Sequence, residues 1–450
     1  MFHSISYPKF TVNVRKPLLL LFTASALLCV GCEMAARSDV GLPLDFPATE
    51  SEFPREAIWS QWLGGDHHGV LLGASVPTQF DPESASWSTP LEGGGNSSPI
   101  VFGNRLFLTS IIEQQGSVAC FDSATGTQLW RRKIEKLDGT SHNKNGWASA
   151  TPTTDGQRVY STFAGKLIIC HDVDGNEIWR HECKGLEHSW GFAASPILHE
   201  GTVIQLCDSD DQSYLVALNK RNGGVVWQVT RESDGNWSTP VIVWANSEEA
   251  GLRRELIVNG TGHRDGQLGI VTAYELNTGN VLWYAEGTTG TPCPTPAVGD
   301  GYVISASGGN GPVFALQTGG SGDVSQTKSL WSEPRGGPYV PSGVVVGIRY
   351  YAVSDTGLLT CSSIVDGELI WKQRLGGTVT SSLVATASHI YATTEEGDIY
   401  VVEHADEFKL VTKNELLETV NATPALISGH LFVRTESNLY CFRKTADGTD

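Results

Sequence analysis

The stretch CFDSATGTQLW, residues 120–130, decides the fold, because close copies of it return along the chain. Each copy joins a short apolar run to a turn and a tryptophan. A glycine stands four residues before the tryptophan in VACFDSATGTQLW (118–130), LIICHDVDGNEIW (167–179), LVALNKRNGGVVW (215–227), VTAYELNTGNVLW (271–283) and LTCSSIVDGELIW (359–371). A period of about 40 to 50 residues predicts a propeller or a solenoid.

Each copy is typical of a β-hairpin, in which glycine takes the positive φ that other residues resist. The tryptophan then lies on the returning strand, where its ring fills the space between neighbouring sheets. A longer copy ends at Trp331 without the glycine, and IYVVEHADEFKL has Leu410 where the tryptophan is expected. The predicted repeat anchors are Trp87, Trp130, Trp179, Trp227, Trp283, Trp331 and Trp371.

A second signature precedes each hairpin, as in SPIVFGNRLFLTS from residue 98 and TPTTDGQRVYSTF from residue 151. Eight such segments start with a small residue, usually followed by proline, which is tolerated at the first residue of a strand. The last unit, 423–443, lacks a fourth strand, and the segment around Trp87 supplies a spare one. We therefore predict an all-β, eight-bladed β-propeller of four-stranded antiparallel blades, closed by pairing of the N-terminal strand with the C-terminal blade.

The bulk composition fits one large exported domain. The 450 residues are 40% hydrophobic and carry a net charge of −18, which argues against nucleic-acid binding. Residues 1–31 resemble a lipoprotein signal peptide that ends before Cys32, the predicted lipidation site, although Cys29 stands where that motif usually has leucine. Ordinary secretion and an uncleaved anchor remain alternatives. We expect a tether at 32–56, a propeller at 57–445, and a monomer that meets the membrane of the cell envelope only through its lipid.

The nine cysteines do not predict a disulfide framework. Cys120, Cys170, Cys361 and Cys441 share one repeat position that holds alanine in other copies, which indicates a small buried site. The pairing of Cys183, Cys207 and Cys293 stays open. The acidic run CDSDD, 207–211, is interpreted as a solvated loop, and no metal site is predicted.

The repeats resemble the PQQ-like β-propeller family, whose units carry the signature ALD-x-x-TG-x-x-x-W. The resemblance covers residues 59 to 442 and includes the opening segment WSQWLGGDHHGV. One branch of the family, the quinoprotein dehydrogenases, binds pyrroloquinoline quinone and calcium. The BamB-like branch consists of lipoprotein scaffolds of outer-membrane barrel assembly and has no cofactor.

Two motifs separate these branches. Dehydrogenases typically carry adjacent cysteines or a Cys-x-x-Cys-His haem motif, and this sequence has neither. The resemblance therefore implies a non-enzymatic scaffold or binding propeller of the BamB-like type, without cofactor or catalytic residues, and with a protein partner in the envelope. A periplasmic quinoprotein-like oxidoreductase with an atypical site is the alternative.

The loops that lead into the first strands of the blades are expected on one face of the propeller. They read SHNKNGWASATP (141–152), HSWGFAASP (188–196), GNWSTP (235–240) and GGPYVPSG (336–343). Aromatic residues beside basic and amide groups suit a ligand or partner site, whereas packing between blades is the structural alternative. The candidate residues are Trp147, Trp190, Trp237, Tyr339, His142, Lys144, His188, Asn236 and Arg335.

Overall fold

The computed structural model describes residues 57–66, 68–138, 141–142, 144–261, 268–290, 292–299 and 301–444. The chain divides into two units, Met1–Leu44 and Asp45–Asp450, and every described residue belongs to the second. The predicted signal peptide, Cys32 and the predicted tether lie outside the described residues. Among the helices of the described ranges, none is long and apolar enough to cross a membrane.

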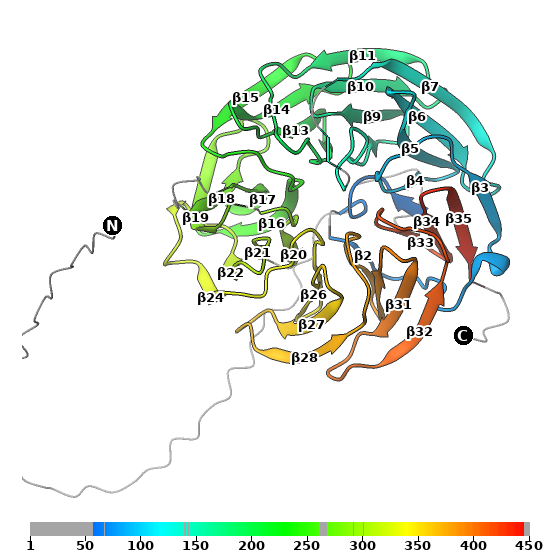
Figure 1. Cartoon of the computed structure of the whole chain (residues 1–450). Helices are drawn as coiled ribbons and strands as arrows, with labels where there is room; N and C mark the ends of the chain where they lie inside the picture. The colour runs from blue at the N-terminus through cyan, green and yellow to red at the C-terminus, as the bar shows by residue number, and fades with distance from the viewer. Residues whose placement is uncertain are drawn as a thin grey trace, which may run out of the picture. The chain divides into compact units, whose positions relative to one another are not determined.

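Eight antiparallel sheets follow one another around a ring and form eight blades, numbered here in chain order (Figure 1). Blades 1 to 4 contain β4 (Ile100–Phe102), β5 (Arg105–Ile112), β6 (Gln115–Asp122) and β7 (Gln128–Lys136); β8 (Thr153–Thr154), β9 (Arg158–Phe163), β10 (Leu167–Asp172) and β11 (Glu177–Glu182); β12 (Ile197–His199), β13 (Thr202–Cys207), β14 (Ser213–Asn219) and β15 (Val225–Arg231); and β16 (Val241–Ser247), β17 (Gly251–Asn259), β18 (Gly269–Tyr274) and β19 (Val281–Thr288).

The remaining blades repeat this order. Blades 5 to 7 contain β20 (Ala297–Gly299), β21 (Tyr302–Ala306), β22 (Val313–Gln317) and β24 (Ser329–Glu333); β25 (Val344–Val346), β26 (Arg349–Val353), β27 (Leu358–Ser363) and β28 (Leu369–Arg374); and β29 (Val384–Thr386), β30 (His389–Thr393), β31 (Asp398–Glu403) and β32 (Leu410–Glu415). Blade 8 contains β33 (Ala425–Ile427), β34 (His430–Arg434) and β35 (Asn438–Arg443). A short β23 (Gly322–Asp323) runs parallel to β19 at the outer edge of blade 4.

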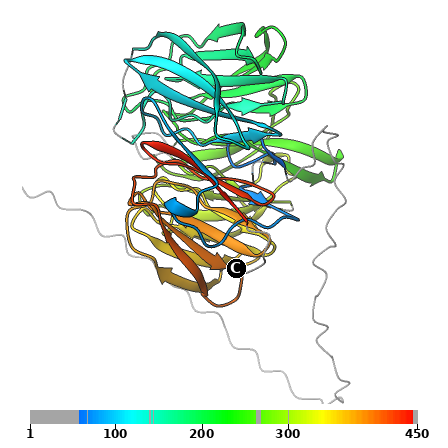
Figure 2. The ribbon, with the colours of Figure 1, turned by 90° about the vertical axis from the view of Figure 1, so that its right-hand side faces the viewer.

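The fourth strand of blade 8 comes from the N-terminal part of the chain. After the 3₁₀ helix η2 (Pro82–Ser84), β3 (Trp87–Pro90) pairs antiparallel with β35, and Trp87 lies opposite Cys441. Figure 2 shows this blue strand beside the red C-terminal strands. The predicted closure of eight four-stranded blades is confirmed, and it pairs two strand edges that a row of repeats would leave open.

A closed ring of hydrogen bonds explains why each unit starts with serine or threonine. In each blade the backbone N–H at this position donates to the hydroxyl of the equivalent residue in the next blade, over 2.9 to 3.1 Å. These buried donors would otherwise lack a partner. The ring runs through Ser98, Thr151, Ser195, Thr239, Thr295, Ser342, Ser382 and Thr423, and returns to Ser98.

The spacing of glycine and tryptophan in the repeat reflects contacts between neighbouring blades. The indole Nε1 of Trp130 in blade 1 donates to the carbonyl of Val173 in the hairpin turn of blade 2, at 2.7 Å. A Cβ on Gly175, in that same turn, would lie 2.7 Å from the Trp130 ring. Equivalent glycine–tryptophan contacts occur for Trp87, Trp179, Trp227 and Trp331. The glycine is therefore needed for two reasons. Its turn requires a positive φ, and the tryptophan of the preceding blade packs where a Cβ would lie.

Blade 7 differs from the sequence prediction at its anchor. Val401 pairs with Thr412, in the register position where Cys361 pairs with Trp371 in blade 6. Leu410 is 48% exposed, so its assignment as the missing anchor is wrong by two residues. Blade 8 has no hairpin between its third and fourth strands, because β3 comes from the other end of the chain. A tryptophan in blade 7 would therefore have no turn glycine to meet.

The segment before β3 lies along the axis of the propeller. β1 (Ile58–Trp59) pairs with β4 on the inner edge of blade 1, and β2 (Val70–Leu71) runs parallel to β29 of blade 7. Between them, Gln61 accepts from the backbone N–H of Leu198 in blade 3, and the Trp62 indole donates to Thr295 of the hydroxyl ring. Several inner strands therefore hold this segment at once.

Candidate binding face

One end of the ring carries the loops that the sequence singled out. In antiparallel blades, the loops entering the first strands and the turns between the second and third strands emerge at the same end. We call this end the loop face, and it comprises residues 141–142, 144–150, 184–194, 232–238, 334–341 and 394–397. The axial segment 58–71 reaches the hydroxyl ring from the other end, because β1 starts beside the turn at Gly103.

Trp190 and Trp237 form a stacked aromatic pair on the loop face. Their rings lie 5.9 Å apart with an interplanar angle of 19°, although they enter different blades, 3 and 4. Trp190 is 53% exposed, whereas Trp237 is half-buried and donates its indole N–H to the carbonyl of Gly191 at 3.0 Å. His188 also packs against Trp237, with the two ring centroids 4.7 Å apart. The pair offers a rigid, accessible aromatic surface.

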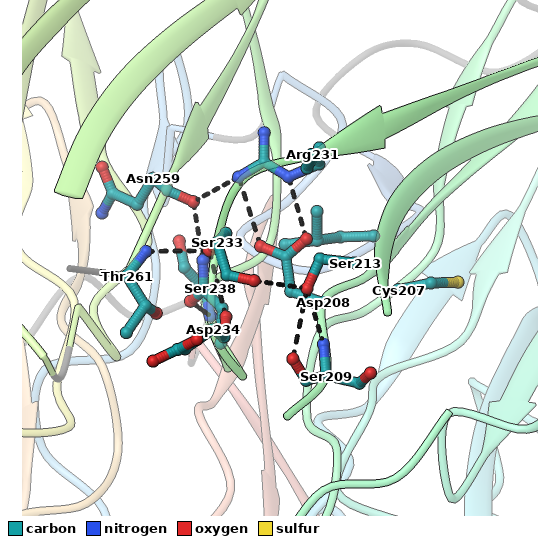
Figure 3. A network of polar contacts seen from close by, with 12 residues as sticks. Cys207, Asp208, Ser209, Ser213, Arg231, Ser233, Asp234, Ser238, Asn259 and Thr261 are labelled. Carbon is teal, nitrogen blue, oxygen red and sulfur yellow. Dashed lines mark hydrogen bonds and ion pairs between the residues drawn. The ribbon is translucent and has the colours of Figure 1, made fainter. Parts of the chain in front are cut away.

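A buried polar network joins the ends of β13 and β15 to the loop that carries Trp237 (Figure 3). The guanidinium of Arg231, at the end of β15, makes two hydrogen bonds to the Asp208 carboxylate, at 2.8 and 3.2 Å. It also donates to the carbonyl of Asn259, which accepts a second bond from the Asn236 amide at 2.6 Å. Burial raises the pKa of Asp208, and the Arg231 ion pair opposes that shift. The interpretation of 207–211 as a solvated loop is wrong for Asp208, which is fully buried.

Lys144 links loops from opposite parts of the ring. Its Nζ donates to Oε1 of Glu395 at 2.7 Å, although Lys144 precedes blade 2 and Glu395 lies in a turn of blade 7. Thr380 donates to the same carboxylate oxygen at 2.5 Å. Burial raises the pKa of Tyr339, and the charge of Lys144 opposes that shift. Lys144 thus connects the loop that enters blade 2 with a turn of blade 7.

The predicted face residues fall into exposed and buried groups. His142, Lys144, Trp190, Arg335 and Tyr339 are exposed. His188 and Asn236 are buried, and burial lowers the pKa of His188, which keeps the imidazole neutral near pH 7. These two residues pack inside the loops and stabilise them, in line with packing as the structural alternative. No pattern in the sequence pointed to Glu395 or Thr380, because the contact of Glu395 with Lys144 joins distant blades.

Trp147 belongs to the packing between blades 1 and 2. It is half-buried against the apolar cluster that contains Phe163, and its carbonyl accepts from the N–H of Ala164 at 3.1 Å. Its indole nitrogen has no hydrogen-bond partner among the described residues, and the same holds for buried side-chain atoms of Asn145, Ser149 and His188. Several polar atoms of the loop face thus retain unused hydrogen-bonding capacity.

The repeat cysteines occupy the buried positions that were predicted. Cys120, Cys170 and Cys441 are fully buried, and the first two lie opposite Trp130 and Trp179 in their hairpins. Burial raises the pKa of Cys120 and of Cys170 to about 12, so both thiols stay protonated at neutral pH. Among the described residues, no group of three or more His, Cys, Asp or Glu side chains is placed to hold a metal ion.

Comparison with known proteins identifies the relatives of this chain. A family model described as Outer membrane protein assembly factor BamB matches residues 114–347 and 267–408. The outer membrane protein assembly factor BamB of Yersinia pestis is 22% identical over 440 residues, covering 97% of this chain and 90% of that protein.

Solved structures share the fold at low sequence identity. BamB from Moraxella catarrhalis superposes with a TM-score of 0.58 at 13% identity, covering 80% of this chain and 99% of that one. The quinohemoprotein alcohol dehydrogenase from Comamonas testosteroni superposes with a TM-score of 0.66 at 13% identity, covering 87% of this chain and 81% of that one. Both branches of the predicted family thus have the same propeller, and at this identity the likeness concerns the fold alone.

Proposed function

Because this chain belongs to the family described as outer membrane protein assembly factor BamB, we propose that it is a non-enzymatic binding propeller of the cell envelope. Its partner is a protein that takes part in the assembly of outer-membrane proteins. The proposal extends to this chain the role that the names of its relatives state for them.

The exposed Trp190, stacked on Trp237, is the observation that carries this proposal. Large aromatic side chains bury much area at a small cost in side-chain entropy, so they dominate the energetics of many protein interfaces. Stacking on Trp237, whose indole is bonded to the Gly191 carbonyl, restricts the ring of Trp190, and this reduces the entropy lost on binding. Lys144, next to the Asn145 amide that donates to the Trp190 carbonyl, and its partner Glu395 supply charged groups of a polar rim beside this surface.

The envelope location of this proposal includes a lipid anchor. Cys32 would become the lipidated N-terminal residue after removal of residues 1–31, and residues 32–56 would tether a monomeric propeller to the membrane. The lipid would then be its only membrane contact. Mass spectrometry of the N-terminal peptide from the exported protein tests this part: a diacylated or triacylated Cys32 supports it, and an unmodified N-terminus supports secretion instead.

The alternative, a quinone-dependent oxidoreductase, finds no matching group of residues. The sequence has no adjacent cysteines, and no candidate metal cluster occurs in the described parts of the chain. We therefore derive no reaction step. Titration of the purified protein with pyrroloquinoline quinone and calcium distinguishes the two functions, since saturable calcium-dependent binding near one quinone per chain would favour the enzyme.

Replacement of Trp190 by serine tests the binding function directly. Ile348 provides a matched control, because it is also 53% exposed but lies in the turn between β25 and β26, at the end of the ring opposite the loop face. We expect Trp190→Ser to weaken retention of outer-membrane assembly proteins by about 30-fold, which corresponds to a hot-spot loss of roughly 2 kcal/mol. Ile348→Ser should retain them. Equal retention by both variants, with unchanged circular dichroism, would contradict the proposed face.

A further inference from the structure

Two cysteine sulfurs from neighbouring blades lie side by side. Cys183 directly follows β11, the outer strand of blade 2, and Cys207 is the last residue of β13 in blade 3. Their Sγ atoms are 3.8 Å apart, and the two residues are 5% and 1% exposed. They belong to one apolar cluster with Tyr214. The two thiols are thus in van der Waals contact within the packed interface between blades 2 and 3. Cysteines that form a disulfide bond are placed in the same way.

Four of the other five cysteines in the described ranges occupy one position of the repeat. Cys120 and Cys170 direct their sulfurs toward the backbone carbonyls of Phe121 and His171, at 3.9 and 3.8 Å. Cys361 and Cys441 occupy the same repeat position in blades 6 and 8. These four positions recur around the ring because the repeat needs a small buried residue there. Leucine takes the place of Cys183 in blades 1, 6 and 7, at Leu137, Leu375 and Leu416, so the repeat itself does not require a cysteine there.

We propose that Cys183 and Cys207 form a disulfide bond that joins blades 2 and 3 when the protein folds in the cell envelope. The sulfurs must approach by roughly 1.8 Å to reach the bonding distance of about 2.0 Å, and rotation about χ1 moves a cysteine sulfur by distances of this order. The envelope outside the cytoplasmic membrane is an oxidising compartment in which structural disulfides persist. The inference about the bond rests on the envelope location in the proposed function, but not on the proposed binding of a partner.

The oxidant is the disulfide of a thiol–disulfide oxidoreductase. One cysteine thiolate attacks that disulfide and forms a mixed disulfide with the enzyme, and the second cysteine then displaces the enzyme's thiolate. The two cysteines lose two electrons and two protons, and the enzyme's disulfide becomes two thiols. Burial raises the pKa of Cys207 well above its usual value, so attack is slow in the folded protein. The bond therefore forms during folding, before the two blades pack.

The bond would fasten both ends of a functional loop. The segment between the two cysteines contains His188, Trp190 and Phe192, and thus the exposed half of the aromatic pair. With the bond in place, the loop is fixed to the end of β11 and to the end of β13. This restricts the positions available to Trp190 in the free protein. The consequence for binding rests on the proposed function, whereas the bond can be detected without it.

Trypsin cleavage provides a direct test, because the sequence isolates each cysteine. Cleavage after Arg180, Lys184 and Lys220 yields the peptides 181–184 and 185–220, each with a single cysteine. The protein is purified from the envelope, its free thiols are alkylated in denaturant without reductant, and the digest is analysed by mass spectrometry. We expect the two peptides as one linked species that separates on reduction, and two more titratable thiols per chain after reduction than before.

Two variants complete the test. Cys183→Ala must abolish the linked species, whereas Cys361→Ala, a buried cysteine of the repeat, must retain it. Reductant should lower the thermal midpoint of the wild type by about 4 °C, from the chain-entropy contribution of a loop of this length, and leave that of Cys183→Ala unchanged. Recovery of both peptides in alkylated form from the envelope protein would overturn the proposal. Trp190→Ser should keep the linked peptides whether or not it loses partner binding. Failure of the binding proposal can thus be distinguished from failure of the disulfide proposal.

Discussion

The contact between Gly175 and Trp130 gives a quantitative test of how neighbouring blades hold together. Gly175 has φ of +85°, and a Cβ at this position would lie 2.7 Å from the Trp130 ring, well inside the usual carbon–carbon contact of about 3.5 to 4.0 Å. An alanine must therefore displace the tryptophan and weaken the 2.7 Å bond from its indole to Val173. Gly429 is the matched control, since it has φ of +74° but no atom within 4 Å of the added Cβ.

The magnitudes separate two contributions to the free energy of unfolding. Gly429→Ala should cost about 1–2 kcal/mol, the strain of a left-handed backbone carrying a side chain. Gly175→Ala adds about 1–3 kcal/mol of overpacking and about 1 kcal/mol for the weakened hydrogen bond, for a total of roughly 3–6 kcal/mol. Guanidinium denaturation followed by circular dichroism measures both. The double variant Gly175→Ala, Trp130→Leu should lose less than the sum of its single changes.

Equal losses for the two glycine variants would refute this reasoning. They would mean that backbone strain alone explains the glycine and that the tryptophan has room to move. Additivity in the double variant would lead to the same conclusion. The glycine four residues before each tryptophan would then be a requirement of the hairpin only.

Three further changes probe the propeller. Thr239→Val leaves the N–H of Ser195 without its acceptor and should lower the free energy of unfolding by about 1–3 kcal/mol, whereas Thr239→Ser should stay close to the wild type in the same denaturation assay. Trp179→Ala removes a ring that is 7% exposed and should cost about 3–5 kcal/mol; a loss below 1 kcal/mol would show that the ring is not packed. Burial lowers the pKa of His171 to about 4, so the unfolded chain, with a histidine pKa of about 6.5, takes up the proton first as the pH falls. Stability should thus decrease by about 2 kcal/mol from pH 8 to pH 5, and His171→Leu should remove that part of the pH dependence.

The repeat pattern was sufficient to predict the architecture, because blade residues obey local rules. Glycine, tryptophan and the starting serine or threonine each recur at a fixed place, and their partners lie in the adjacent blade at the same height. The repeat period was therefore sufficient to predict both the number of blades and the closure of the ring by the strand that carries Trp87. The mistaken assignment of Leu410 arose where the repeat is interrupted, since the absence of a hairpin in blade 8 removes the partner that an anchor tryptophan would need.

The loop face was only partly predictable. Sequence order indicated that Trp190 and Trp237 share one end of the ring, but not that their rings stack or that Asn236 is buried and bonded to the Asn259 carbonyl. Contacts such as that of Lys144 with Glu395 join residues 251 positions apart and follow no repeat. Asp208 can be buried because its carboxylate pairs with Arg231. Asp208 follows β13, whereas Arg231 ends β15, two strands later in the same blade. Such pairs depend on loop conformation, which the repeat does not specify.

Photocrosslinking at position 190 tests the central claim, that the loop face binds a protein of outer-membrane assembly. A photoreactive amino acid replaces Trp190 in one variant and Ile348 in the other, two sites of equal exposure at opposite ends of the ring. Each variant is expressed in its own envelope, irradiated and analysed by mass spectrometry. The account predicts a specific adduct with an outer-membrane assembly protein from position 190 and none from position 348. An adduct from position 348 alone, or none from either in a folded protein, would contradict it.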